Sequence, residues 1–389
     1  MQDFLETKGL DVRWYDRFHE IPEKAYRQLA GDQKSPFLDY NWLCWLEDSG
    51  SVSPVHGWEP RHLALWQGSE LRALAPLWLR NHSWGEFVFD FMWADAAAQL
   101  GVPYYPKLVG MSPLTPSDAY YFLVAPHHDS KALSARLWQE IQAFMDKEGI
   151  VTCAFNWVDK NWTPEMRERG FLLWEHQSYL WTNPGFHGFE DYLEGFSKNQ
   201  RRNIRRERQK IVQAGLEVRV IQGSEITEKD FLSMYGFYKA TNDRFGPWAA
   251  KFLNQEFFKG LQQRAAGSVV LFAAYEKNGG KALAMSMLLF NKRRLIGRYW
   301  GSRVRVDSLH FELCYYAPIQ WAIEQGILEF DPGFGSPHKV RRGFRAVSSH
   351  SLHYFTEPLM TRLMENYLYQ LNQDNQEQID YLNSLLPLK

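Results

Sequence analysis

Cysteine is scarce in this chain of 389 residues, and the three that occur are far apart. Cys44, Cys153 and Cys314 show none of the short spacings that bind zinc or form a redox pair. Each lies in an apolar stretch, which predicts reduced core thiols and a cytoplasmic protein. The sequence also has no CxxC or HExxH motif and no Ser-His-Asp order, so a metal enzyme or a serine hydrolase is disfavoured and no metal site is expected.

Long apolar runs are absent as well. No stretch reaches the roughly 18 apolar residues that a membrane-spanning helix needs, so we expect no membrane span. The first residues of the chain are polar and lack the apolar core of a secretory leader. The net charge is −1. The molecule as a whole therefore has no field that would attract nucleic acid or a membrane, and any such binding requires a local patch.

Apolar and aromatic residues are plentiful, at 45% and 16% of the chain, as expected of a globular protein. The 16 Trp residues suggest either aromatic-lined grooves or a Trp-rich core. The length predicts two domains, and the Gly-bounded segment 185–195 suggests a division into residues 1–190 and 191–389. Strand and helix patterns alternate throughout, which predicts an α/β or α+β fold with mixed sheets.

Two hairpin-like segments suggest an internal repeat. Strands are expected at 61–66 and 71–80, followed by a third at 87–91. The first pair resembles the segment 271–284, about half the chain further on, and two copies of one αβ unit would explain the likeness. Chance similarity between two apolar hairpins is the alternative. From Pro358 onward the pattern predicts a C-terminal helix.

The stretch 295–344 gathers more reactive side chains than any other. It predicts a strand at 295–301, a helix capped by Asp307 or Ser308 and ended by Gly326, and a strand at 327–330. Such a crossover places two parallel strands side by side, and ligands bind at the carboxyl ends of such strands. The residues expected there are Tyr299, Trp300, His310, Glu312, Tyr315, Asp331, His338, Lys339 and Arg342.

A basic helix is predicted at 197–214. Between Lys198 and Lys210 there are seven Lys or Arg residues and one Glu. Ile204 and Ile211 fall on one face, and Arg201, Arg205 and Arg208 fall on another. The run is either a solvated charged face or a ridge that binds the phosphates of RNA or of a diphosphate.

The order of elements in residues 210–344 resembles the GNAT (Gcn5-related N-acyltransferase) fold, and two such units in tandem resemble the FemABX peptidyltransferases. The match is most detailed with the FemAB-like N-acyltransferases of peptidoglycan biosynthesis or recognition, and it covers roughly residues 12–356. The segments that carry it are SPFLDYNWLCWLEDSGSV (35–52), FMWADAAAQLGVPYYPKLV (91–109), RRNIRRERQKIVQAGL (201–216), RYWGSRVRVDSLHFELCYYAPIQWAIEQGILEFDPG (298–333) and HKVRRGF (338–344).

This resemblance implies two tandem GNAT-like domains with mixed sheets, and transfer of an acyl or aminoacyl group to an amine. The acceptor would be a small molecule, a peptide or a peptidoglycan precursor, and the donor would be aminoacyl-tRNA or acyl-CoA, with no further cofactor. The segment 301–308 would correspond to the glycine-rich loop with which GNAT enzymes bind the pyrophosphate of CoA, but it has one glycine, at its start, and two valines. Two alternatives stay open: an acyl-CoA-dependent N-acetyltransferase, and a non-catalytic module that binds a cell-wall precursor.

Acyl transfer to an amine needs a base, a donor for the leaving atom and groups that bind substrate. His338 is the first candidate for the base, with Glu312 as the alternative, and Tyr299 or Tyr315 would protonate the leaving group. The remaining candidates are substrate-binding residues: Lys339, Arg342, His310, Asp331 and Trp300, with Tyr104, Tyr105 and Lys107 from the first half of the chain. For each, an ordinary structural or solvent-exposed role is the competing interpretation.

Overall fold

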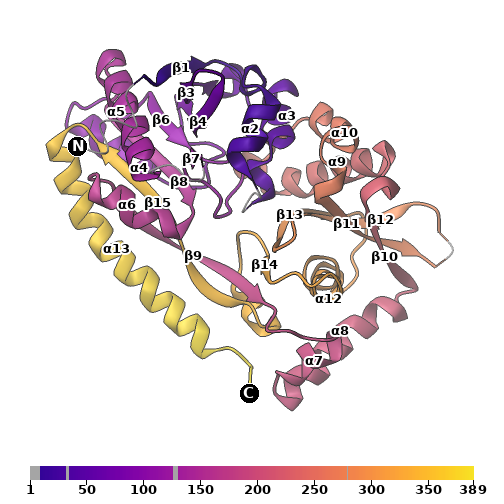
Figure 1. Ribbon diagram of the computed structural model, residues 1–389. Helices are drawn as coiled ribbons and strands as arrows, with labels where there is room; N and C mark the ends of the chain where they lie inside the picture. The colour runs from indigo at the N-terminus through magenta and orange to yellow at the C-terminus, as the bar shows by residue number, and fades with distance from the viewer. Residues whose placement is uncertain (1–8, 32–34, 126–129, 278) are drawn as a thin grey trace. The chain divides into compact units, whose positions relative to one another are not determined.

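The computed structural model describes residues 9–31, 35–125, 130–277 and 279–389 (Figure 1). Residues 1–8, which include most of the polar N-terminus considered above, lie outside this part. The chain forms two compact units: unit 1 within residues 1–33, 37–176 and 349–374, and unit 2 within 34–36, 177–348 and 375–389. Among the described helices, none has the length and apolar character needed to cross a bilayer.

Unit 1 contains two sets of strands. The smaller is antiparallel, in the order β1 (Asp11–Tyr15), β3 (His62–Gln67), β4 (Glu70–Ala75) and β7 (Leu123–Val124). The larger has the order β15 (Arg345–Phe355), β8 (Thr152–Val158), β6 (Lys107–Gly110), β5 (Trp78–Arg80) and β2 (Trp58–Pro60). β6 and β8 are parallel and the other described pairs are antiparallel, so this sheet is mixed.

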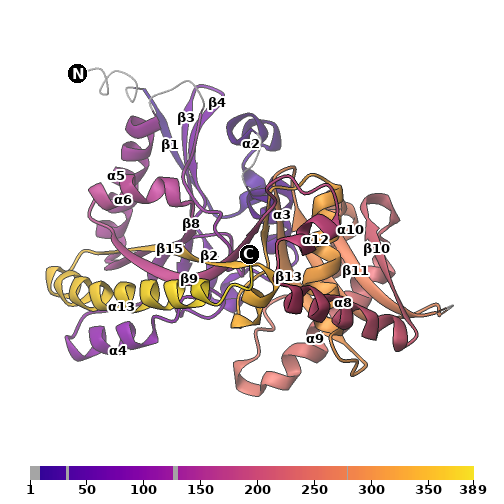
Figure 2. The same cartoon turned by 90° about the horizontal axis from the view of Figure 1, so that it is seen from below.

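The helices of unit 1 cover these strands. They are α2 (Glu23–Ala30), α3 (Tyr40–Asp48), α4 (Phe91–Gln99), α5 (Ser130–Glu148), α6 (Thr163–Glu168) and the first part of α13 (Pro358–Ser384). In α5, Leu137, Ile141 and Met145 recur every four residues and therefore share one face. That face packs against the apolar side of β3 and β4, as Figure 2 shows.

Unit 2 is built on one mixed run of strands. Their order is β10 (Leu216–Gln222), β11 (Val269–Glu276), β12 (Ala282–Phe290), β13 (Arg294–Ser302), β14 (Glu329–Asp331) and β9 (Leu172–Thr182). β13 and β14 are parallel, while the other neighbours are antiparallel. The predicted crossover between two parallel strands is therefore present.

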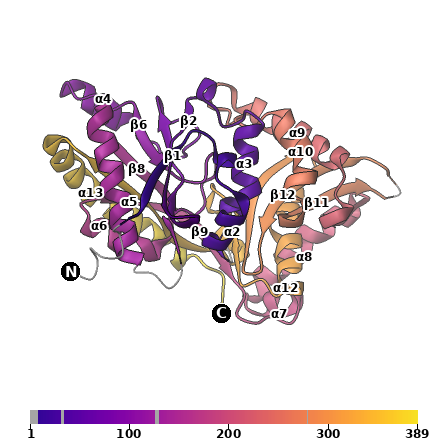
Figure 3. The ribbon, with the colours of Figure 1, turned by 45° about the horizontal axis from the view of Figure 1, so that its top comes forward.

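Helices cover both faces of the unit 2 strands. They are α7 (Phe189–Glu194), α8 (Lys198–Gln213), α9 (Glu228–Asn242), α10 (Gln255–Arg264), α11 (Leu309–Phe311), the π-helix η8 (Glu312–Tyr316), α12 (Ala317–Glu324) and the 3₁₀-helix η9 (Pro337–Arg342). Figures 1 and 3 place α9 and α10 on one side of β11 and β12, and α8 and α12 on the other. Ile379 and Leu382, near the end of α13, join this core.

Three local predictions were wrong. The segment 71–80 is two strands, β4 and β5, because Pro76 between them has no N–H to donate to a ladder. The segment 87–91 is not a strand: Phe87 has a φ of 59°, and α4 begins at Phe91. Ser308 does not cap the next helix with its side chain, and its own φ is 69°.

The helix after Ser308 also changes its geometry. Residues 312–316 form a π-helix before α12 begins at Ala317. Pro318 lacks the N–H that would bond to the carbonyl of Cys314 in an α-helix, which explains why α-helical bonding is interrupted here. Such short π-helical segments are frequent at functional sites.

A cluster of charged side chains lies in the core of unit 1. Lys107 Nζ lies 2.5 Å from Asp90 Oδ2 and 2.9 Å from Glu86 Oε2, and Arg80 Nε lies 3.3 Å from Glu86 Oε1. All four side chains are fully buried, and their formal charges cancel. Burial lowers the pKa of Lys107, but the two carboxylates outweigh this effect and raise it to about 12, so Lys107 is charged.

Replacement of Lys107 by Met should destabilise the protein by about 3–5 kcal/mol, because Glu86 and Asp90 would lose their shared cation in the core. Lys147→Met is the matched control: Lys147 is 79% exposed, and its replacement should change stability by less than about 0.5 kcal/mol. Urea unfolding followed by tryptophan fluorescence measures both. Equal stabilities for the two variants would show that the buried cluster does not stabilise the fold.

Candidate functional site

The site lies where β13 and β14 stop pairing. The two strands are in register only from Arg294 opposite Glu329 to Ile296 opposite Asp331, and β13 continues to Ser302. A Cβ on Gly297 would lie 3.1 Å from the carbonyl group of Pro332. Glycine at this position therefore lets the chain after β14 pass close to β13. That chain then forms η9, which carries His338, Lys339 and Arg342.

His338 and Tyr315 form a hydrogen-bonded pair. His338 Nε2 lies 3.1 Å from the Tyr315 hydroxyl, and its Nδ1 lies 2.6 Å from Ser336 Oγ, so both ring nitrogens have hydroxyl partners. Burial, together with the positive charges of Arg342 and Lys339, lowers the pKa of His338 to about 4. The imidazole is therefore neutral at pH 7, and its unprotonated nitrogen is a weaker base than that of a solvent-exposed histidine.

His310, another predicted residue, lies next to this pair, and Trp300 lies next to His310. The His310 ring lies 5.3 Å from that of Tyr315, 5.8 Å from that of His338 and 5.0 Å from that of Trp300. Burial, with His338 and the nearby cations, lowers the pKa of His310 to about 3. His310 is therefore a neutral, aromatic neighbour of the pair. The structure thus brings together four residues predicted from 295–344.

Lys339 is a buried cation next to this group. Only 1% of the residue is exposed, its Nζ donates to the Gly333 carbonyl at 2.6 Å, and the ammonium lies 5.0 Å from the centre of the Tyr179 ring. Burial lowers the pKa of Lys339 to about 8, although Asp331 acts in the opposite direction. A cation that loses its proton so close to neutrality is unusual for a merely structural lysine.

Arg342 makes its contacts within unit 2. Its Nη1 donates to the His338 carbonyl at 2.8 Å, its Nη2 donates to Glu207 Oε2 at 2.8 Å, and its guanidinium stacks 3.4 Å from the centre of the Phe311 ring. The residue is 3% exposed. Arg342 is therefore placed to position η9 more directly than to bind substrate.

Glu312 is directed towards α8 and pairs with Arg208. Arg208 Nε and Nη2 donate to the Glu312 carboxylate at 2.9–3.2 Å, and Nη2 also donates to Gln320 Oε1 at 3.0 Å. Burial raises the pKa of Glu312, and Arg208 opposes that rise. Although Glu312 and Tyr315 are three residues apart on one helix, they contact different partners.

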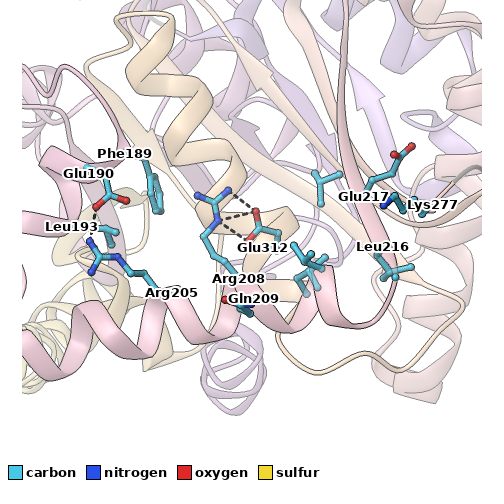
Figure 4. A pocket seen from close by; sticks show the side chains of 14 residues that line it. Phe189, Glu190, Leu193, Arg205, Arg208, Gln209, Leu216, Glu217, Lys277 and Glu312 are labelled. Atoms are coloured by element: carbon cyan, nitrogen blue, oxygen red, sulfur yellow. Dashed lines mark hydrogen bonds and ion pairs between the residues drawn. The ribbon is translucent and has the colours of Figure 1, made fainter.

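The Arg208–Glu312 pair borders a hollow of about 780 Å³. Figure 4 shows Arg208 extending from α8 to Glu312, with Arg205 and Glu190 paired at one end and Glu217 and Lys277 at the other. Phe189, Leu193 and Leu216 give the hollow an apolar lining. The positive and negative side chains that line the hollow are equal in number, so it has no net positive charge to bind a polyanionic ligand.

Four predicted residues lie away from the His338 group. Tyr299 packs on the other side of β13, with its ring 5.2 Å from that of Tyr238 in α9. Tyr104, Tyr105 and Lys107 belong to the buried cluster of unit 1, where the Tyr104 hydroxyl donates to Asp90 at 2.7 Å and that of Tyr105 lies 2.8 Å from Ser83 Oγ.

The basic helix α8 exposes only part of the predicted arginine face. Arg208 is turned inward, and Arg205 pairs with Glu190 at 2.5 Å. Arg202 and Arg206 are exposed, and each donates to the asparagine three residues earlier, Asn199 or Asn203, at 3.2 Å. Both arginines lie roughly opposite the buried Ile204 and Ile211. The helical period of the sequence predicts this arrangement.

Two other residues were missed. Ser336 is one of the small residues of a loop, and nothing local marks it as a partner of His338. Glu207 is the one acidic residue in the basic run, and this isolated position was the feature of the sequence that could have identified it. Among the described residues, no three His, Cys, Asp or Glu side chains are grouped so that they could hold a metal ion.

Comparison with known structures supports the fold. The crystal structure of FemX matches 91% of this chain and 100% of its own, with 12% identity and a TM-score of 0.53. The C-terminal domain of a putative lysylphosphatidylglycerol synthetase from Agrobacterium fabrum matches 89% of this chain and 96% of its own, with 10% identity and a TM-score of 0.53. At these identities the likeness concerns the fold. Curated proteins gave no match.

A family model covers nearly the whole chain. Residues 17–389 match the FemAB-like family, described as acting in peptidoglycan biosynthesis or recognition. The likeness to FemX confirms the predicted α/β fold class, and the family match confirms the predicted resemblance to the FemAB-like proteins of peptidoglycan biosynthesis or recognition. The chain therefore belongs to the FemAB-like family.

Proposed function

We propose that the chain transfers an acyl or aminoacyl group from an activated donor to an amine on a peptidoglycan precursor or another peptide. The observation that carries the proposal is the Tyr315–His338 hydrogen bond at the carboxyl edge of β13 and β14, with the cation of Lys339 beside it. Membership of the FemAB-like family supports the reaction class. The named residues and the substrates are our proposal.

The pair can move the proton that aminolysis releases. As the neutral amine attacks the carbonyl carbon, its proton passes to the Tyr315 oxygen while the Tyr315 hydroxyl proton passes to His338 Nε2. When the bond between carbon and the leaving oxygen or sulfur breaks, the proton returns along the same path to that atom. Burial raises the pKa of Tyr315, so the tyrosine does not persist as an anion.

Lys339 supplies positive charge to this site. We propose that its ammonium stabilises the negative charge that develops on the carbonyl oxygen, or that it binds a substrate carboxylate. Because its pKa is about 8, most of the group is charged at pH 7. Arg342, which pairs with Glu207, and Glu312, which pairs with Arg208, support the site without contacting substrate.

We infer aminoacyl-tRNA as the donor, with acyl-CoA as the alternative. In the segment 301–308, the Arg303 N–H donates to the Leu283 carbonyl at 2.9 Å and the Val304 N–H donates to Ser302 Oγ at 3.1 Å. These amides are not free to bind a pyrophosphate. The exposed face of α8, with Arg202, Arg205 and Arg206, would instead bind phosphates of tRNA. Such a donor implies a cytoplasmic reaction.

His338→Ala should lower kcat by about 10²-fold or more, the usual size of a general acid–base contribution. Tyr315→Phe should have an effect of similar size, because it interrupts the same proton path. His187→Ala is the matched control: His187 is exposed and belongs to the same unit, so its replacement should leave kcat unchanged. Single-turnover transfer to a peptide amine measures all three. Full activity in both site variants would exclude the pair from the reaction.

Lys339→Met should stabilise the protein at pH 7 by about 1–3 kcal/mol. The pKa of Lys339 is about 8 in the folded chain and 10.5 in the unfolded chain. The unfolded state therefore binds more protons in this range, and the wild type gains stability as the pH rises from 8 to 10.5. The advantage of the variant should shrink over the same interval.

Thermal unfolding of wild type and Lys339→Met from pH 7 to 10 measures this difference. Lys259→Met, at an exposed position of α10, is the control and should show no pH-dependent advantage. A constant difference across the range would mean that Lys339 titrates normally and is not held in a destabilised state.

A further inference from the structure

We infer that Glu207 of α8 is a positioning residue for His338, acting through Arg342. This inference rests on the proposed role of His338 in acyl transfer and deepens it. Glu207 does not touch the Tyr315–His338 pair, and no pattern in the sequence connects it with a residue more than a hundred positions later.

The Glu207 carboxylate lies between the two segments that carry the proposed proton path. Its Oε2 accepts a hydrogen bond from Arg342 Nη2 at 2.8 Å, and it also accepts one from the hydroxyl of Tyr316, the residue after Tyr315. The side chain of Glu207 is 22% exposed and that of Arg342 is 4% exposed. A charge-assisted bond in such a partly buried place is stronger than a neutral one.

Arg342 extends this contact to His338. Its Nη1 donates to the backbone carbonyl of His338 at 2.8 Å, and its guanidinium carbon lies 3.4 Å from the centre of the Phe311 ring. The carbonyl of Arg342 itself accepts from the Tyr192 hydroxyl at 2.9 Å. The guanidinium therefore joins α8, α11 and η9 and fixes the backbone from which the imidazole extends.

A second contact from α8 supports the same short helix. Gln200 Nε2 donates to the carbonyl of Arg341 at 2.6 Å. Gln200 and Glu207 are seven residues apart and so lie on the same side of α8. Two consecutive residues of η9 are thus bonded to one face of α8, while the opposite face carries the exposed arginines.

The length and geometry of η9 explain why it needs such support. It is a six-residue 3₁₀-helix, and its hydrogen bonds have poorer geometry than those of an α-helix. Gly335 and Gly343, at its two ends, have φ values of 128° and 77°, which few other residues adopt. The side-chain contacts from α8 add to the buried Phe344 at its end and help to determine where His338 lies.

The test replaces Glu207 by Gln, which keeps the size of the side chain and an acceptor for Tyr316 but removes the charge that binds Arg342. We expect kcat to fall about 10-fold while KM stays within about twofold, because misplacement of a reacting group lowers the rate more than it weakens binding. Glu194→Gln, at the exposed end of α7, is the matched control and should match the wild type.

A spectroscopic measurement separates positioning from catalysis. In protein labelled with ¹³C at histidine Cε1, the His338 resonance is assigned by its absence from His338→Ala. It should shift in Glu207→Gln and, by a smaller amount, in Gln200→Ala, but not in Glu194→Gln. Gln200→Ala, which removes no charge, provides a second test should Glu207→Gln fail to fold.

The outcomes distinguish this inference from the proposed function. If the His338 resonance and kcat are both unchanged in Glu207→Gln and Gln200→Ala, Glu207 does not position His338. If the resonance shifts in Glu207→Gln but His338→Ala keeps full activity, the positioning inference holds, and the assignment of His338 to the reaction is wrong.

Discussion

The inner face of α8 provides the contacts on which the candidate site depends. Glu207 bonds to Arg342 of η9, and the next residue, Arg208, bonds to Glu312 of the π-helix. Each pair joins α8 to one of the two segments that carry His338 and Tyr315. Arg342 and Glu312 are largely buried. Loss of the charge on Glu207 or Arg208 would therefore leave its buried partner without a compensating charge.

The two units use buried charge in different ways. In unit 1, Lys107, Arg80, Glu86 and Asp90 neutralise one another within the core, and this raises the pKa of Lys107. In unit 2, Lys339 is bonded to a neutral carbonyl, and burial lowers its pKa to about 8. The first arrangement stabilises the fold. The second keeps a lysine with a lowered pKa buried beside the proposed site, and functional groups are often kept in such costly environments.

Much of the candidate site could be predicted because its residues are close in sequence. The strand, helix and strand of 295–331 follow from apolar runs, a terminal glycine and Asp331-Pro332-Gly333, so the grouping of His310, Tyr315 and His338 was accessible. The Arg208–Glu312 pair was not, since its members are 104 residues apart and no local pattern links them. Nor could the sequence tell which face of β13 meets α11 and which meets α9. As neighbours in a strand, Tyr299 and Trp300 had to point to opposite faces, but only the structure shows that Tyr299 meets Tyr238 of α9 and Trp300 meets His310.

The most direct test of the central claim is mass spectrometry of an amine acceptor after a single turnover. A peptide with a free amine is incubated with the protein in two separate reactions, one with aminoacyl-tRNA and one with acyl-CoA. We expect the mass of the peptide to increase by one aminoacyl group with the wild type and aminoacyl-tRNA, and to stay unchanged with His338→Ala. A peptide of unchanged mass with both donors, under conditions where the protein binds the peptide, would contradict it and favour a non-catalytic binding module.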